Sequence, residues 1–177
     1  MYDNKNHYCP SVSGNLEAIS QGLELCRQLD QNSYNHKATP YVQSSIGEHL
    51  RHINDLYFAI KNEANVGVVD YDHRRRGAPV ESDLEVGIAE LEQIESWLKQ
   101  LTEEQLDRDI SILSEASISS QQVCEIPSNM RRELLFVASH TIHHFALMRV
   151  AAIHCDVDTN EHLGYAPATA TYLRGQA

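Results

Sequence analysis

Hydrophobic residues recur at spacings of three and four along four long segments of the chain, as they do in helices that bury one face. This periodicity predicts four helices long enough to span a small domain, with no internal repeat between them. Their approximate ranges are Gly14 to Tyr34, Ser45 to Asn65, Ser82 to Leu101 and Asn129 to Cys155.

Residues that stabilise helix ends stand at the start of each segment. Ser13 and Ser128 are placed to cap the first and the fourth helix. Ser45 and Glu48 form the S-x-x-E pattern of a capping box at the start of the second. Asp83 falls in the first turn of the third helix, where the helix dipole favours an acidic side chain.

The connections between the helices are uneven. About fifteen residues, including Asp72 to Pro79, separate the second and third helices, and loops of that length are functional or disordered. Short alternating runs at Asp109 to Ile112 and Gln122 to Ile126 predict a small β-hairpin between the third and fourth helices. The pattern favours an all-α four-helix bundle forming a single domain, with a core at about 13–156 and a C-terminal tail at 157–177 that closes with a short helical turn.

The fourth segment contains His140, His143 and His144. Residues four apart share one face of a helix, so His140 and His144 can present two imidazole nitrogens to one point. We expect both to point inward, with His143 nearer the edge of the apolar stripe, although spacing alone leaves a His140/His143 pairing open. The helix is expected to be central to the core because it also carries Leu134, Leu135, Ile142, Phe145 and Val150.

A metal site built on two histidines needs at least one further ligand from another helix. The second helix offers His49 and His52. Periodicity slightly favours His49, which lies closer to the centre of the apolar stripe. A site near the rim of a bundle would suit a flanking residue such as His52, so the pattern leaves the choice open.

Two motifs on these helices resemble a known family. A Ser-x-x-Glu-x-Leu-x-His-x-x-Asp pattern opens the second helix, and His-x-x-x-His follows in the fourth. In this order they resemble the DinB/YfiT-like superfamily of bacterial metalloenzymes over about residues 13 to 155. The resemblance implies an up-down-down-up four-helix bundle whose metal is held by three histidines. By position these ligands are His52, His140 and His144, since the flanking positions of the motif fit His52 rather than His49.

The resemblance also implies a type of chemistry. Neutral imidazoles suit divalent Zn, Ni, Fe or Cu, and three of them leave a coordination position open. Several relatives are metal-dependent transferases or isomerases that use a low-molecular-weight thiol. We therefore expect a divalent metal ion, with Zn, Ni or Fe foremost, and a thiol-dependent transferase or isomerase acting on a small molecule, with hydrolysis as the nearest rival. The second hypothesis is a metal-stabilised bundle that binds a ligand or partner without catalysis, and no catalytic or cofactor-binding residue is assigned.

The charge of the chain limits its partners. Fourteen Lys and Arg against 25 Asp and Glu give a net charge of −11, which argues against nucleic acid and anionic membranes. Arg74, Arg75 and Arg76, beside His73, are the only concentrated positive charge. If this loop folds over the metal it would favour an anionic substrate or thiol, because guanidinium groups bind carboxylates and phosphates. The simpler interpretation is a solvated loop or pairing with acids of the same chain.

Location and redox state are suggested by what the sequence lacks. No apolar run approaches the roughly 20 residues of a membrane span, and the N-terminus has no signal-like pattern, so we expect a cytoplasmic protein. Cys9, Cys26, Cys124 and Cys155 contain no C-x-x-C pair, which predicts buried free thiols rather than disulfides or a thiolate zinc site. The wide apolar faces of the helices are compatible with a homodimer.

Overall fold

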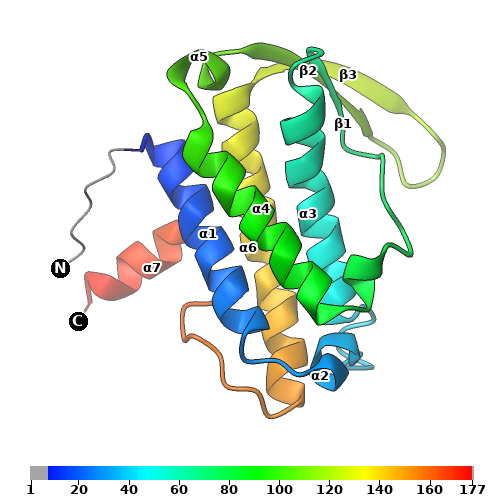
Figure 1. The fold of residues 1–177 in the computed structure, drawn as a ribbon, viewed down its shortest axis with the longest axis vertical. Coiled ribbons are helices and arrows are strands. Elements are labelled where there is room, and N and C mark those ends of the chain that lie inside the picture. The colour runs from blue at the N-terminus through cyan, green and yellow to red at the C-terminus, as the bar shows by residue number, and fades with distance from the viewer. Residues whose placement is uncertain (1–7, 177) are drawn as a thin grey trace.

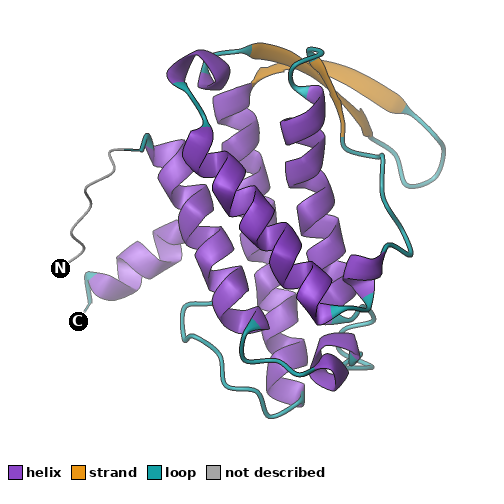
Figure 2. Ribbon diagram, in the orientation of Figure 1, coloured by secondary structure: helices purple, strands orange, loops and turns teal. Residues whose placement is uncertain are grey.

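The computed structural model describes residues 8–176 and shows four long helices packed side by side, with a small sheet at one end (Figures 1 and 2). In Figure 1, α1 and α6 run downward while α3 and α4 run upward, which is the up-down-down-up arrangement. The predicted all-α four-helix bundle is therefore confirmed. The four helices are α1 (Pro10–Cys26), α3 (Ile46–Glu63), α4 (Leu84–Gln100) and α6 (Met130–His154).

The first helix starts and ends earlier than predicted. It begins at Pro10, a residue suited to the first helical position, so the predicted cap Ser13 lies inside the helix. It ends at Cys26, and a separate short helix, α2 (Gln31–Asn35), follows. The chain breaks there because the Asp30 carboxylate accepts a hydrogen bond from the backbone N–H of Ser33 and caps α2.

The start of α6 also differs from the prediction. Asn129, rather than Ser128, caps this helix, and its side chain accepts a hydrogen bond from the backbone N–H of Arg132. Ser128 belongs to the preceding strand, and its hydroxyl donates to the carboxylate of the buried Glu133. The predicted position is wrong by one residue because two capping-type residues stand next to each other.

Helix α3 begins as the sequence predicts, while α4 begins at Leu84, so that Asp83 caps this helix instead of lying in its first turn. In α3, the Ser45 hydroxyl accepts from the backbone N–H of Glu48, whose carboxylate accepts from the backbone N–H of Ser45. In α4, the Asp83 carboxylate accepts from the backbone N–H groups of Glu85 and Val86. Both caps pair N–H groups that the first turn of a helix leaves without a backbone acceptor.

The predicted β-hairpin is present and forms part of a three-stranded sheet. Strands β2 (Asp109–Glu115) and β3 (Val123–Asn129) are antiparallel, with Ile112 opposite Ile126. Strand β1 (Val68–Asp70) pairs in parallel with β2 and was not predicted, because three residues are too few to show a period. The sheet closes the end of the bundle where α3 ends and α6 begins (Figure 2). Three short helices complete the fold: α5 (Glu103–Leu106), a 3-10 helix (Pro79–Glu81) and α7 (Pro167–Arg174) in the tail.

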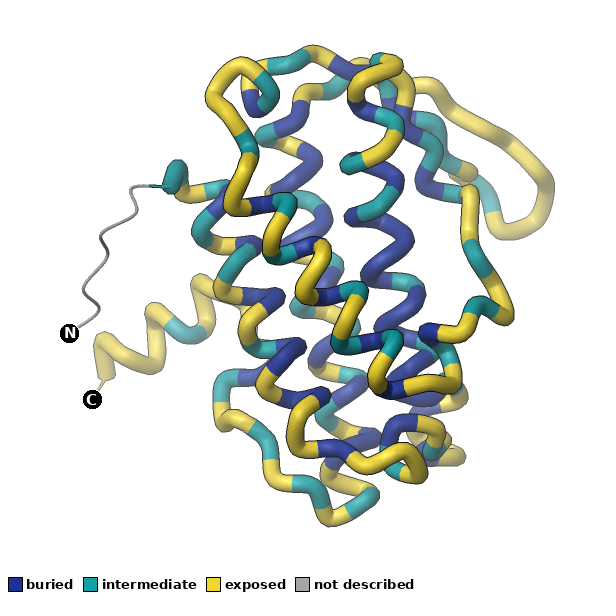
Figure 3. The backbone as a smooth tube through the Cα atoms, in the orientation of Figure 1, coloured by how far each residue is buried: buried dark blue, intermediate teal, exposed yellow. Residues whose placement is uncertain are grey.

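The core lies between the inner faces of the four long helices, where Figure 3 shows the buried residues concentrated. In α6, Leu134 and Phe145 are fully buried, as predicted. Leu135 and Val150 are 66% and 42% exposed, so the expectation that they widen the core is wrong, because they face away from the other helices. The four cysteines are free thiols, but only Cys26 is fully buried.

Helix α6 is the one described helix whose length and composition would allow it to cross a membrane. About 39% of its apolar window is buried inside the bundle, and the core helix of a soluble protein has the same composition. This feature is weak evidence and does not indicate a membrane protein.

Candidate metal centre

Three imidazole rings meet between α3 and α6. His52 comes from α3, and His140 and His144 lie one turn apart on α6. The Nε2 atom of His140 is 2.8 Å from Nε2 of His52 and 3.0 Å from Nε2 of His144. One nitrogen from each ring lies within 4.8 Å of the other two.

Hydrogen bonds among these three rings, the histidine cluster, cannot account for both close contacts of His140. A ring nitrogen has either one hydrogen or one lone pair, so Nε2 of His140 can form a hydrogen bond in only one of its two close contacts. A divalent metal ion would accept all three lone pairs. Two nitrogens bound to a tetrahedral zinc ion lie about 3.3 Å apart, which is close to the 2.8 and 3.0 Å that separate Nε2 of His140 from the other two Nε2 atoms. The donor set therefore fits a divalent metal ion.

The environment keeps these rings neutral. Burial is the main cause that lowers the pKa of His52 to about 4 and the pKa of His144 to about 3, and it also lowers the pKa of His140. The positive charge of Arg74 lowers the pKa of His52 and His140 further. At neutral pH the three lone pairs are free of protons, which is the state that binds a metal.

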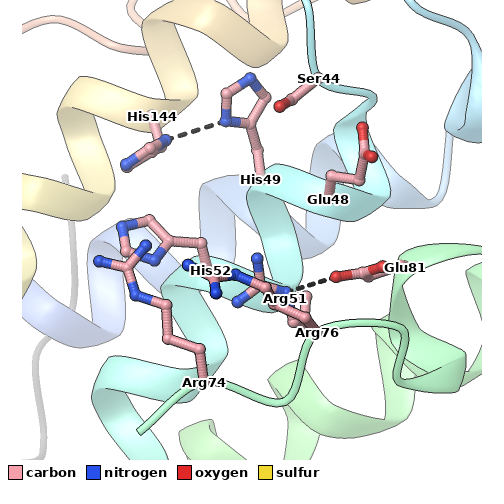
Figure 4. A pocket seen from close by; sticks show the side chains of 9 residues that line it. All are labelled: Ser44, Glu48, His49, Arg51, His52, Arg74, Arg76, Glu81 and His144. Atoms are coloured by element: carbon pink, nitrogen blue, oxygen red, sulfur yellow. Dashed lines mark hydrogen bonds and ion pairs between the residues drawn. The ribbon is translucent and has the colours of Figure 1, made fainter. Parts of the chain in front are cut away.

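A cavity of about 450 Å³ lies against the cluster (Figure 4). His52 and His144 form part of its wall, so an ion held by the three nitrogens would be reached from this cavity. Its lining comes from α3, α6, the chain just before α3 and the long connection between α3 and α4. The lining residues are Ser44, Glu48, His49, Arg51, His52, Arg74, Arg76, Glu81 and His144.

The sequence model of the DinB family matches residues 1–155. The chain belongs to the DinB family. Its fold matches that of a DinB-like protein, YjoA, from Bacillus subtilis, with a TM-score of 0.63 and 23% identity over 88% of this chain and 99% of that one. It is also 26% identical over 111 residues to FK506-binding protein 5 of Rhizopus delemar, and this match covers 63% of the chain but 29% of that protein. The DinB-family chain thus spans less than a third of that relative's length.

Within this DinB-family bundle, His49 lies behind His144 rather than in the cluster. The two Nδ1 atoms are 3.0 Å apart, and Figure 4 shows the two rings joined by this contact. If Nε2 of His144 keeps its lone pair for a metal, its Nδ1 has the hydrogen and donates to Nδ1 of His49. Among the described residues the buried Nε2 of His49 then has no partner. The sequence left open whether His49 or His52 is the ligand on α3. In the structure His52 lies among the three nitrogens, and His49 contacts His144.

His143 does not join the three nitrogens. It is exposed, and its ring centroid is 5.4 Å from that of His144 and 6.2 Å from that of His140. A site built on His140 and His143 would therefore lack a third imidazole ligand, whereas His140 and His144 both face His52.

A network of charged side chains fixes the wall of the cavity. Asp55, whose side chain is 4% exposed, accepts from Arg51 at 2.8 Å and from Arg75 at 2.6 Å. Arg51 also donates to Glu81 at 2.7 Å, and Arg75 donates to Glu90 at 2.7 Å. These bonds tie the long connection to α3 and α4.

The run of three arginines thus divides. Arg75 pairs with acids of the same chain, as in the simpler of the two interpretations of this loop, while Arg74 and Arg76 line the cavity. The sequence did not predict that Glu81 and Glu90 pair with arginines. Acidic residues in polar segments are common, and only the fold shows which cation each one faces. Asp55 entered only as one position of the family motif.

Proposed function

We propose that this DinB-family protein is a metal-dependent enzyme in which His52, His140 and His144 hold a divalent ion beside a substrate-binding cavity. The observation that supports it best is the convergence of three neutral imidazoles at the wall of a cavity of about 450 Å³. Zinc, nickel and iron are the ions we expect, because neutral imidazole nitrogens suit them.

Several features favour a catalytic ion over a structural one. Structural zinc sites are closed by four protein ligands, whereas among the described residues only these three His, Cys, Asp or Glu side chains form such a group. The core is built from fully buried side chains such as Tyr57 and Phe145, which are not among the three proposed ligands. The bundle is therefore expected to fold without the metal.

The reaction class that we propose is transfer or isomerisation with a low-molecular-weight thiol, with hydrolysis as the rival. When bound, the ion would supply a Lewis acid that lowers the pKa of a thiol or a water molecule. The chain would contribute three neutral ligands, the contact from His49 that orients His144, and a cavity that holds the second substrate. The family resemblance favours the thiol over water.

Metal analysis of protein purified without an affinity tag tests the proposal. We expect about one ion per chain, a chelator-treated protein that keeps its helical circular dichroism, and turnover of an electrophile that requires both metal and thiol. Unfolding on metal removal would indicate a structural ion instead. Stoichiometric metal without turnover of any thiol or hydrolysable substrate would favour a non-catalytic binding module.

A further inference from the structure

Two cations at the cavity have no partner among residues 8–176. Arg74 and Arg76 line the cavity with exposed side chains. Across residues 8–176, neither guanidinium group takes part in a hydrogen bond or an ion pair, whereas Arg75 between them binds two carboxylates. The loop therefore separates one anchoring arginine from two that are free to bind something else.

The acids of the cavity wall do not neutralise these cations. Glu81 accepts from Arg51 at 2.7 Å, and Glu48 accepts from Lys37 at 2.9 Å and from the backbone of its own helix cap. Each acid already has a cation of its own. The wall thus has two unpaired positive charges, in a protein whose net charge is −11.

The loop holds both arginines toward the cavity. Arg75 is fixed by Asp55 and Glu90, and its carbonyl accepts from the N–H of Ala78 at 3.0 Å, which closes a turn. Gly77 in this turn has φ +75°, a conformation that residues with a side chain rarely adopt. Figure 4 shows Arg74 extended toward His52 from this loop.

We propose that Arg74 and Arg76 form an anion subsite that selects small molecules with a carboxylate or phosphate group and orients them toward His52, His140 and His144. Guanidinium groups bind both kinds of oxyanion through paired N–H donors. The proposal rests on the proposed function only in taking the cavity as the substrate site. The subsite itself needs no metal, because the loop that carries both arginines is fixed by the contacts of Arg75 with Asp55 and Glu90.

Isothermal titration calorimetry tests the subsite with three probes: succinate, inorganic phosphate and the neutral succinamide. Each is titrated into the metal-free and the zinc-loaded protein. We expect succinate or phosphate to bind, succinamide to bind at least tenfold more weakly, and the double variant Arg74→Gln/Arg76→Gln to lose about tenfold in oxyanion affinity in both forms. Whichever oxyanion binds more tightly identifies the substrate group.

The matched control is Arg27→Gln/Arg174→Gln, which removes the same charge from exposed positions just after α1 and at the end of α7. It should bind the oxyanions as the unmodified protein does. The proposal is overturned if neither oxyanion binds, if succinamide binds equally well, or if both double variants weaken binding alike. Failure of zinc to bind would contradict the proposed function alone, since the metal-free titration still decides the subsite.

Discussion

Helix α3 has two sets of buried or half-buried polar side chains, and they differ in whether the described chain supplies their partners. Arg51 and Asp55 belong to a network in which each carboxylate faces a guanidinium at 2.6–2.8 Å. His49 and His52 instead face other histidines, nitrogen against nitrogen, and each has a buried ring nitrogen without a partner among the described residues.

The chain itself completes the first set, whereas the second set is suited to hold an added ion. Buried polar groups in folded proteins are nearly always hydrogen-bonded, and a partly satisfied cluster costs stability. The charged network satisfies that rule within the chain and ties the cavity wall to the bundle. The histidine cluster does not satisfy it within the described chain, because its ring nitrogens face one another, and an added ion could accept the three lone pairs that meet between α3 and α6.

The largest effect is expected from removing a member of the histidine cluster. His140→Ala or His144→Ala should abolish stoichiometric metal binding, because two remaining imidazoles hold a divalent ion too weakly. His52→Ala should do the same. Metal content per chain is the measurement, with urea unfolding of the metal-free proteins to show that the fold persists.

His143→Ala is the matched control, since it removes an exposed imidazole from the same helix and should keep the metal. Full metal retention by both the His140 and His144 variants would show that the site is elsewhere. If His49→Ala loses the metal while His52→Ala keeps it, the ligand on α3 is His49, as helical periodicity alone had favoured.

Removing one member of the charged network should instead affect folding. Asp55→Asn leaves the nearly buried Arg51 without one of its carboxylates and leaves Arg75 with Glu90 as its remaining carboxylate, so we expect a loss of about 3 kcal/mol in the free energy of unfolding. Chemical denaturation of the metal-free protein measures it. Glu92→Gln breaks an exposed pair with Arg27 and should change stability by less than about 0.5 kcal/mol. A similarly small loss for Asp55→Asn would mean that the network does not hold the structure.

The sequence predicted most of the fold because helix periodicity and capping residues are local signals. The capping box at Ser45 and Glu48 and the β-hairpin were both readable. Strand β1 was not, since its pairing with β2 depends on residues more than forty positions away. The break after Cys26 was missed because Asp30 fits a helix surface as well as a cap until its partner Ser33 is seen.

The candidate site was also predicted only in part from the sequence. Four-residue spacing placed His140 and His144 on one face, but the choice between His49 and His52 depends on how α3 is rotated against α6, which apolar periodicity defines only coarsely. The separate roles of Arg74, Arg75 and Arg76 depend on Asp55 and Glu90, whose positions only the folded chain reveals.

A smaller effect is expected from His49, which contacts a ligand without belonging to the cluster. His49→Ala removes the acceptor for Nδ1–H of His144, and we expect metal affinity to fall about 10- to 100-fold while the stoichiometry stays at one ion per chain. Competition with a chelator of known affinity measures the change. His49→Gln should recover part of the loss, because its amide oxygen can accept the same hydrogen. An unchanged affinity in His49→Ala would show that His144 needs no such support.

The smallest effect is expected from pH. The folded protein lowers the pKa of His52 to about 4 and of His144 to about 3, whereas an unfolded histidine has a pKa of about 6.5. Below pH 6.5 the unfolded chain therefore binds more protons than the folded one, so stability is fully present above this pH and is lost as the pH falls toward 3. Urea unfolding of the metal-free protein at pH 7 and pH 5 should show a loss that is smaller by about 1 kcal/mol in His144→Gln, since that variant lacks one of these groups. Equal losses in the two proteins would mean that His144 is not held neutral by the fold.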